Sequence, residues 1–182
     1  MNNVSITRIL TGHKTTQNIF KGVFPSDQIP LSRPKFKPVC YVANIDPARF
    51  AGSHWVALYL TPEGENEYFD SYGLPPILPR FLKLLRFDYR YNATQLQSLK
   101  STVCGQYCVF YVWRKSLGES LERIINYFTD ERHENDLIVN QIVEDEFNVD
   151  LDVVSPDFIY SQMASTLHRF QLHLNLAGLR RY

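Results

Sequence analysis

The stretch CGQYCVFYVWRKS, residues Cys104–Ser116, decides the fold of this chain. Its side chains are apolar nearly all round a helical wheel, which is typical of a helix buried inside a domain. Leu117 and Gly118 follow it and indicate where that helix ends. The polar loop Gln97–Thr102 precedes it. Cys104 therefore stands where a polar loop runs into a buried helix.

Strand patterns come before this helix and helical patterns come after it. Val39–Asn44 and His54–Leu60 are apolar runs of strand length, and Glu67–Asp70 follows the second run after a turn-like Thr-Pro-Glu-Gly. The last two runs predict a β-hairpin. The remaining predicted elements are a helix over Leu78–Phe87, a strand over Tyr89–Gln97, and helices over Leu121–Phe128, Asn135–Phe147 and Pro156–Leu174.

This order of elements predicts an α+β fold. We expect a small mixed β-sheet that packs against a central buried helix with Cys104 at its N-terminus, and additional helices toward the C-terminus. A length of 182 residues fits a single domain over 1–182. Residues 1–37 are interrupted by glycines and prolines and predict an extended N-terminal arm, with only a short helical possibility around Ile6–Leu10. Residues from about 120 to 182 predict a helical part.

Charge and cysteine content restrict the classes of function. Nineteen basic residues balance nineteen acidic ones, so no overall field attracts a nucleic acid or a membrane surface. The basic stretch from Arg80 to Arg90 is interpreted as the solvated face of an amphipathic helix. Three cysteines suit a reducing compartment better than a disulfide scaffold. Without a signal-peptide pattern or a membrane-length apolar run, we expect an intracellular, soluble chain, with a monomer favoured.

The chemistry predicted for Cys104 is that of a nucleophile. A cysteine attacks only as its thiolate, which needs a nearby imidazole to take the proton and is stabilised by a helix N-terminus. Gly105 removes side-chain bulk where a substrate would approach. Cys108, one turn deeper, and Cys40, inside a strand pattern, are expected in the core.

His54 and Asp70 complete a predicted triad. His54 begins one strand pattern and Asp70 ends the next, so antiparallel pairing brings them together. An aspartate that holds the imidazole in one tautomer satisfies the logic of a catalytic triad. Gln97 is the candidate side chain for an oxyanion hole, with Gln95 as its rival. Taken singly, each of these residues has an ordinary explanation, as a surface histidine, a turn aspartate or a loop glutamine.

Other kinds of site are not predicted. Cys104 and Cys108 lie one helical turn apart without a second Cys or His pair at finger-like spacing, so no metal site is expected. Phosphate-binding loops, dinucleotide-binding glycine patterns and metalloprotease helix motifs are not found in the sequence either.

The joint pattern HW…FDSYG…Q-x6-CGQYC resembles the adenovirus-type maturation proteases (adenain), which share fold and catalytic order with the SUMO- and ubiquitin-like-specific proteases. The segments IFKGVFPSDQIP and VCYVAN are also similar, and the resemblance covers roughly residues 10–115. The spacing of seven residues from Gln97 to Cys104 is similar to that in adenain, whereas an aspartate at position 70 is similar to the SUMO proteases. The pattern points to the viral or virus-like transposon branch.

The resemblance implies a papain-like, adenain-like fold and a role for each matching residue. Cys104 is implied as nucleophile, His54 as base, Asp70 as the third member and Gln97 as the oxyanion glutamine. Trp55 is implied as one wall of a narrow substrate cleft, and it is equally well explained as a core aromatic.

The implied activity is cleavage of viral or virus-like precursor proteins, capsid components among them, at Gly-Gly-like sites. In a viral setting the chain would act in the host nucleus or cytoplasm and in the virion. The covalent peptide activator of adenovirus enzymes is not expected, because the region around Arg86 has no cysteine. The DNA cofactor is not expected from a neutral chain, so no cofactor is predicted.

Two alternatives stay open. The chain could act as a deSUMOylase or deubiquitinase on ubiquitin-like conjugates, or it could be a catalytically silent binding module of the same fold.

Overall fold

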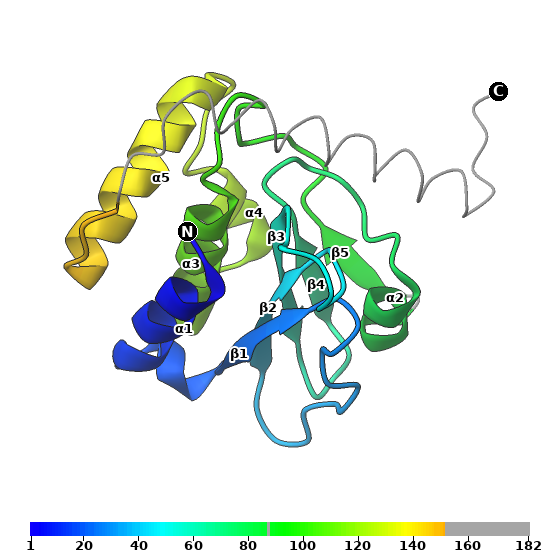
Figure 1. Cartoon of the computed structure of the whole chain (residues 1–182). Helices are drawn as coiled ribbons and strands as arrows, with labels where there is room; N and C mark the ends of the chain where they lie inside the picture. The colour runs from blue at the N-terminus through cyan, green and yellow to red at the C-terminus, as the bar shows by residue number, and fades with distance from the viewer. Residues whose placement is uncertain (87, 152–182) are drawn as a thin grey trace, which may run out of the picture.

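The computed structural model describes residues 1–86 and 88–151 of the chain (Figure 1). Its strands are β1 (Phe20–Pro25), β2 (Val39–Asn44), β3 (Trp55–Leu60), β4 (Asn66–Phe69) and β5 (Tyr89–Tyr91). Its helices are α1 (Asn3–Gly12), the 3-10 turn η1 (Thr16–Asn18), α2 (Pro79–Leu85), α3 (Cys104–Ser116), α4 (Leu121–Ile125) and α5 (Arg132–Phe147).

The five strands form one mixed sheet in the order β1-β2-β3-β4-β5. The two edge strands run parallel to their neighbours, and β2, β3 and β4 pair antiparallel. The predicted hairpin is confirmed, because Ala57 of β3 pairs with Phe69 of β4. This register brings the residue before β3, His54, to the same end of the sheet as the residue after β4, Asp70.

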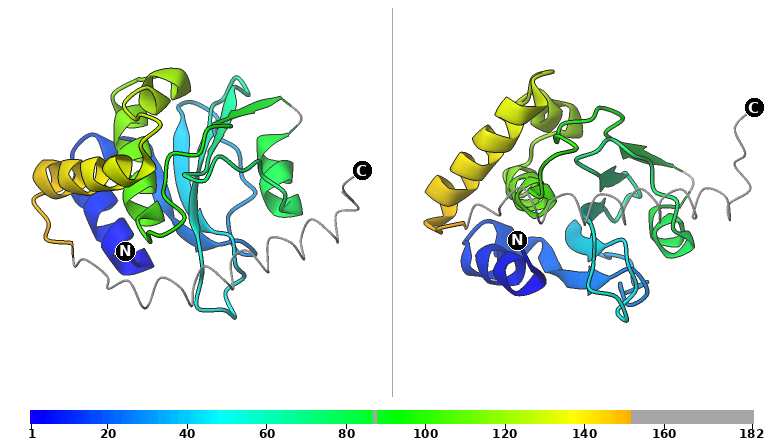
Figure 2. Two further views of the ribbon diagram at one scale, coloured as in Figure 1. Left: turned by 90° about the horizontal axis from the view of Figure 1, so that it is seen from above. Right: turned by 45° about the horizontal axis from the view of Figure 1, so that its top comes forward.

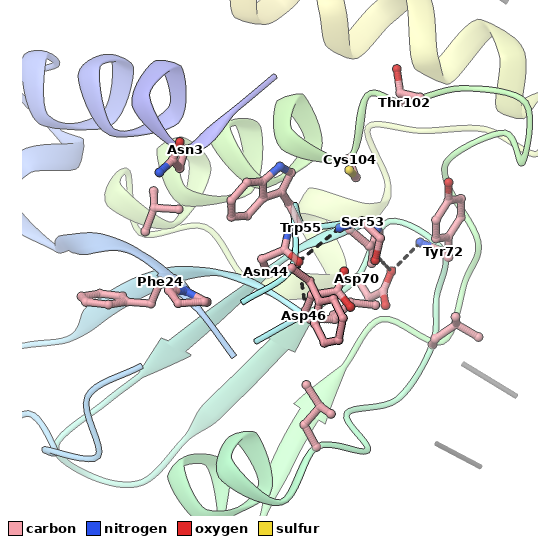
Figure 3. A pocket seen from close by; sticks show the side chains of 18 of the residues that line it. Asn3, Phe24, Asn44, Asp46, Ser53, Trp55, Asp70, Tyr72, Thr102 and Cys104 are labelled. Atoms are coloured by element: carbon pink, nitrogen blue, oxygen red, sulfur yellow. Dashed lines mark hydrogen bonds and ion pairs between the residues drawn. The ribbon is translucent and has the colours of Figure 1, made fainter. Parts of the chain in front are cut away.

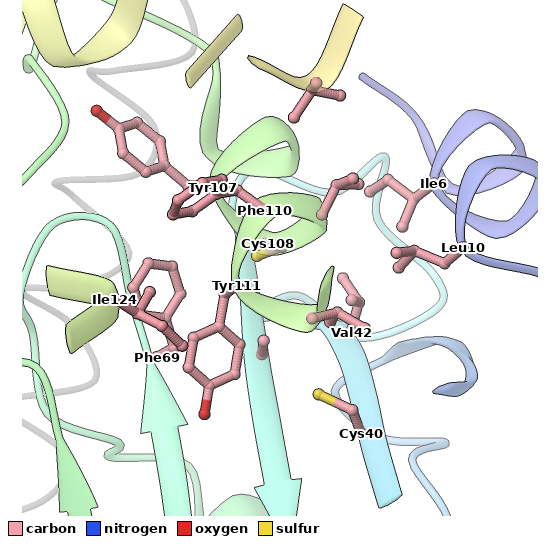
Figure 4. Packing of buried hydrophobic residues seen from close by; sticks show 14 of the residues in the cluster. Ile6, Leu10, Cys40, Val42, Phe69, Tyr107, Cys108, Phe110, Tyr111 and Ile124 are labelled. Atoms are coloured by element: carbon pink, nitrogen blue, oxygen red, sulfur yellow. The ribbon is translucent and has the colours of Figure 1, made fainter. Parts of the chain in front are cut away.

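Helices cover both faces of the sheet, which explains why its central strands are apolar without alternation. Helix α3 packs on one face beneath α1 and α5, and α2 covers the other face (Figures 1 and 2). Strand β2 is buried along its whole length. Cys40 and Val42 join the core around α3 (Figure 4), and Val39, Tyr41 and Ala43 join the core around α2. The predicted α+β fold with a buried central helix is confirmed.

The prediction of an extended arm over residues 1–37 is wrong, whereas the short helical possibility around Ile6–Leu10 is confirmed as part of the longer helix α1. Asn2 caps α1, because its Oδ1 accepts a hydrogen bond from the Ser5 N–H at 2.9 Å. The apolar residues of α1, Ile6, Ile9 and Leu10, are buried in the core around α3. Further along, β1 adds a parallel edge strand beside β2. The prolines mark only the end of β1 and the connection 26–38, and they do not make the whole segment irregular.

The other predicted elements differ mainly in length. Strand β5 ends at Tyr91, because the next residue, Asn92, is buried and uses its side chain on the backbone of Asp70. Helices α2, α4 and α5 lie where they were predicted, with shifted ends. The predicted helix Pro156–Leu174 lies outside the described residues. In the part of the chain that the structure describes, no helix is both long and apolar enough to cross a membrane.

A buried ionic cluster fixes α3 against the sheet. Glu67 of β4 is 1% exposed, and its carboxylate lies 2.7 Å from the Arg90 guanidinium and 3.0 Å from the Lys115 ammonium. The Tyr111 hydroxyl also donates to Glu67, at 2.7 Å. Since Tyr111 and Lys115 belong to α3, this single carboxylate joins the helix that carries Cys104 to the strand that leads to Asp70.

We expect Lys115→Met to lower the free energy of unfolding by about 3 kcal/mol, because it leaves a buried carboxylate without one of its two cations. Urea denaturation followed by circular dichroism measures this change. Lys100→Met, at an exposed position, is the matched control and should unfold like the wild type. Equal unfolding curves for the two variants would contradict a stabilising role for Lys115.

Candidate active site

His54 and Asp70 form a direct pair at one end of the sheet. The His54 Nε2 lies 2.8 Å from the Asp70 Oδ1, and both residues are 3% exposed. The same Asp70 oxygen accepts the Tyr72 N–H at 2.8 Å (Figure 3). Asn92 holds the Asp70 backbone from behind, because its Oδ1 accepts the Asp70 N–H at 2.9 Å and its amide donates to the Asp70 carbonyl. Asp70 is therefore fixed in orientation before any substrate binds.

Cys104 is the first residue of α3 and lies at the same cavity as Asp70 (Figure 3). The N-cap residue, Val103, supplies no side-chain hydrogen bond to the first turn. The backbone N–H groups that begin a helix have no partners within it, and together with the helix dipole they favour negative charge nearby. An uncapped N-terminus thus leaves these N–H groups available to a thiolate or to a developing oxyanion.

The pKa values of Cys104 and His54 shift toward an ion pair. Burial disfavours the thiolate, but the hydrogen bond and the charge of His54, with the Trp55 backbone N–H, lower the pKa of the Cys104 thiol. Burial also disfavours the imidazolium, but the charge of Asp70 and its hydrogen bond, together with Cys104, raise the pKa of His54 to about 10. Both shifts favour the thiolate with imidazolium over the neutral pair, and the charged pair is the state ready for nucleophilic attack.

We expect the rate of Cys104 alkylation by iodoacetamide to fall less between pH 8 and about pH 6 than the rate of an ordinary thiol, because the lowered pKa of Cys104 keeps more of the thiolate populated. An ordinary thiol loses reactivity roughly tenfold for each pH unit below its pKa of about 8.5. Mass spectrometry of the native chain at a series of pH values measures the rate, and the same chain in denaturant is the control. If the native rate falls as steeply as the denatured one, the ion pair does not exist.

The other two cysteines have the opposite character. Cys40 and Cys108 are 0% and 1% exposed, and burial raises the pKa of each thiol above its ordinary value. Their predicted place in the core is confirmed. Within residues 1–86 and 88–151, no three His, Cys, Asp or Glu side chains converge on a point that could hold a metal ion.

Tyr72 is a site residue that the sequence reasoning missed. Its ring stacks on the His54 imidazole with centroids 4.8 Å apart and an interplanar angle of 26°. This contact covers one face of the imidazole and restricts rotation of the ring. The signal was present, since Tyr72 lies within the FDSYG pattern, but that pattern does not reveal a ring-on-ring contact.

Gln97 is close to the triad but does not line the cavity. It is fully buried, and its Oε1 accepts the Ser71 hydroxyl at 2.7 Å. Its amide nitrogen donates to the Ser101 carbonyl at 2.9 Å and to the Tyr72 hydroxyl at 3.3 Å. The rival, Gln95, does line the cavity and donates to the Gln97 carbonyl at 2.8 Å. In this conformation both protons of the Gln97 amide are used by the protein itself.

The cavity beside Cys104 has a volume of about 600 Å³, which falls in the range of ligand-binding clefts. Trp55 lines this cavity and is half-buried, and its Nε1 donates to the Met1 carbonyl at 3.2 Å. Most of the remaining wall is apolar, and it includes Phe24, Ile45, Phe50, Leu74, Leu78 and Leu99.

Gly105 is placed differently from the expectation. It does not line the cavity, and a Cβ at this position would lie 2.9 Å from the Met1 Cβ and 3.4 Å from the Ile6 side chain. The absence of a side chain at Gly105 therefore makes room for the N-terminal segment of this chain and not for a substrate.

Comparisons with known proteins give only distant likenesses. No protein-family model and no curated protein matches this sequence. Among solved structures, the crystal structure of an ASFV protease is 24% identical with a TM-score of 0.39, over 57% of this chain and 43% of that one. The central domain of an uncharacterized Legionella pneumophila protein is 14% identical with a TM-score of 0.49, over 81% of this chain and 96% of that domain. This chain thus spans less than half of the length of the ASFV protease, and neither likeness bears on its chemistry.

Proposed function

We propose that this chain is a cysteine endopeptidase that uses Cys104 as nucleophile, His54 as acid and base, and Asp70 to orient His54. The observation that carries the proposal is the buried hydrogen-bonded series from Asp70 through His54 to Cys104, in which the thiol pKa is lowered. Three residues from separate segments meet in the order that nucleophilic catalysis requires.

The proposed reaction has two halves. The Cys104 thiolate attacks the scissile carbonyl, and the His54 imidazolium gives its proton to the leaving amine, which leaves a thioester on Cys104. Water then attacks the thioester while neutral His54 takes its proton, and the acid product leaves with the thiolate restored. The Cys104 backbone N–H, at the uncapped start of α3, supports the oxyanion in both halves. Gln97 joins as a second donor once its amide turns from Ser101 and Tyr72 toward the carbonyl.

The substrate class follows from access to the sulfur. Cys104 is 8% exposed, and Trp55 is half-buried beside it. A polypeptide reaches a nucleophile recessed to this degree most easily where its own side chains are missing, so glycine on the acyl side of the cleaved bond is favoured. This agrees with the Gly-Gly-like sites that the sequence pattern implies. On the strength of that sequence pattern alone, we propose viral or virus-like precursor proteins, capsid components among them, as the substrates.

The experiment uses a peptide that ends in Gly-Gly with a vinyl sulfone in place of the scissile carbonyl. Peptide mapping after reaction of the full chain should find the adduct on Cys104 and not on Cys40 or Cys108. Prior treatment with iodoacetamide should block it. An adduct spread evenly over the three cysteines, or none at all, would contradict the proposal and would favour a silent binding module.

A panel of reporters then separates peptidases from isopeptidases of ubiquitin-like conjugates. Cleavage of a short Leu-x-Gly-Gly peptide at a rate comparable to that of ubiquitin or SUMO carrying a C-terminal fluorophore supports the endopeptidase. Much faster release from the ubiquitin-like reporters would replace the precursor substrate by a conjugate, with the same three residues.

A further inference from the structure

Asp136 of α5 is a buried carboxylate that the triad does not use. It is 5% exposed and lies against the loop that leads from Gln97 to Cys104. The Ser98 N–H donates to its two oxygens, at 3.4 and 3.2 Å, and the Ser101 hydroxyl also hydrogen-bonds with it. One side chain therefore contacts both ends of the segment Ser98–Ser101, whose carbonyl at Ser101 accepts the Gln97 amide.

Asn135, the residue before Asp136 on α5, binds the same loop at Leu96, just before Gln97. The Asn135 amide donates to the Leu96 carbonyl at 3.1 Å, and the Leu96 and Gln97 N–H groups donate to the Ser71 carbonyl at 2.9 and 3.0 Å. The backbone around Gln97 is thus fastened to the segment after β4 on one side and to the first turns of α5 on the other.

Tyr107 joins this arrangement to the helix of the nucleophile. Its hydroxyl lies 3.1 Å from the Asp136 Oδ1 and 3.2 Å from the Leu96 carbonyl. The hydroxyl has one proton, so it can donate to only one of these oxygens at a time. With Asp136 ionised, the proton goes to the carboxylate. With Asp136 protonated, the acid donates to the Tyr107 oxygen and Tyr107 donates to Leu96.

We propose that Asp136 is a positioning residue whose ionised carboxylate fixes the loop Leu96–Ser101, and with it Gln97, relative to Cys104. The proposal rests on the peptidase function argued above. It adds that a residue of α5, outside the active site, determines the position of a loop of that site. Asp136 touches neither Cys104 nor the cavity, so it acts only through the loop and Tyr107.

The pKa of Asp136 lies in a pH range where turnover can be measured. Burial raises its pKa to about 6, against the opposing hydrogen bonds of Ser101, Tyr107 and Ser98 and the charge of His133. The titratable groups facing it are Tyr107 of α3, His133 of α5 and Tyr72 from the segment after β4. Below about pH 6 the carboxylate takes a proton, and Ser98 loses a charge-assisted partner. Turnover should then fall as the pH drops below about 6, and this decline is the acidic limb of the pH profile.

The test is Asp136→Asn in the full chain, with Asp145→Asn on the exposed surface of α5 as matched control. We expect a loss of about 10- to 100-fold in kcat with KM little changed, since a small misplacement of a catalytic group has effects of this size. The decline of turnover below about pH 6 should be absent in this variant, and the rate of Cys104 alkylation should equal that of the wild type. An unchanged kcat, or a limb that persists in Asp136→Asn, would overturn the proposal.

Hydrogen exchange at the Ser98 amide separates this proposal from the peptidase proposal. Wild-type protection, corrected for intrinsic rates, should drop between pH 7.5 and pH 5, and it should be low and nearly constant with pH in Asp136→Asn. If the wild type has no turnover but shows this pattern, the peptidase proposal fails and the control of the loop stands. If the wild type turns over while Ser98 protection is equal in both variants, the loop proposal fails alone.

Discussion

Cys104→Ser is expected to lower turnover of a Leu-x-Gly-Gly peptide by about four orders of magnitude or more, the scale seen when a nucleophile is removed from a triad. A serine hydroxyl gives its proton to a neighbouring imidazole far less readily than a thiol does, because the pKa of the hydroxyl is much higher. The charge of the Cys104 thiolate is also one of the causes that raise the pKa of His54, and a neutral serine does not supply it. Chromatography of the cleavage products, at substrate concentrations below KM, measures the loss.

Cys108→Ser is the matched control for that variant. Cys108 lies one helical turn deeper and is buried among core residues away from the cavity, so its replacement should reduce stability and leave kcat near the wild-type value. Residual turnover above about one hundredth of wild type in Cys104→Ser, or a comparable loss in Cys108→Ser, would move the nucleophile away from Cys104.

The elements that could be predicted are those in which nearly every residue is buried, because such elements form one continuous run of apolar residues in the sequence. Cys104–Ser116 and Val39–Asn44 have the predicted bounds, because each is surrounded by protein on nearly all sides and so is apolar nearly throughout. Residues 1–37 could not be predicted in the same way. Their helix, α1, buries only one narrow stripe, and the pairing of β1 with β2 depends on a partner far along the chain.

In the candidate site, too, some residues could be predicted from a sequence pattern and others could not. His54 and Asp70 could be placed together from sequence, because antiparallel pairing brings the start of β3 and the end of β4 to the same end of the sheet. Tyr72, Asn92 and Asp136 could not, because ring stacking and side-chain hydrogen bonds between distant segments have no periodic signature in the sequence. The sequence next to Cys104 predicted that a substrate would lie beside Gly105. The observed neighbours are Met1 and Ile6, about a hundred residues earlier in the chain, and local spacing cannot reveal such a contact.

Asp70→Asn is expected to lower kcat by about 10³- to 10⁴-fold with folding retained, the scale found when the orienting carboxylate of a triad becomes an amide. An asparagine fills the same space and its carbonyl oxygen can still accept the Tyr72 N–H, but it has no charge to stabilise the imidazolium. Since the charge and hydrogen bond of Asp70 are the main causes that raise the pKa of His54, that pKa should fall in the variant. The thiolate of Cys104 then loses its partner as well.

The pH dependence of turnover tests this reasoning independently of the size of the loss. In the wild type, activity requires protonated His54 and should decline as the pH rises through about 10, where the imidazolium loses its proton. In Asp70→Asn the decline should begin at lower pH, whereas in Asp130→Asn, at an exposed position, it should stay where it is in the wild type. An alkaline limb that does not move, with kcat within about threefold of wild type, would make Asp70 a turn residue, since a lost orienting carboxylate costs far more than that.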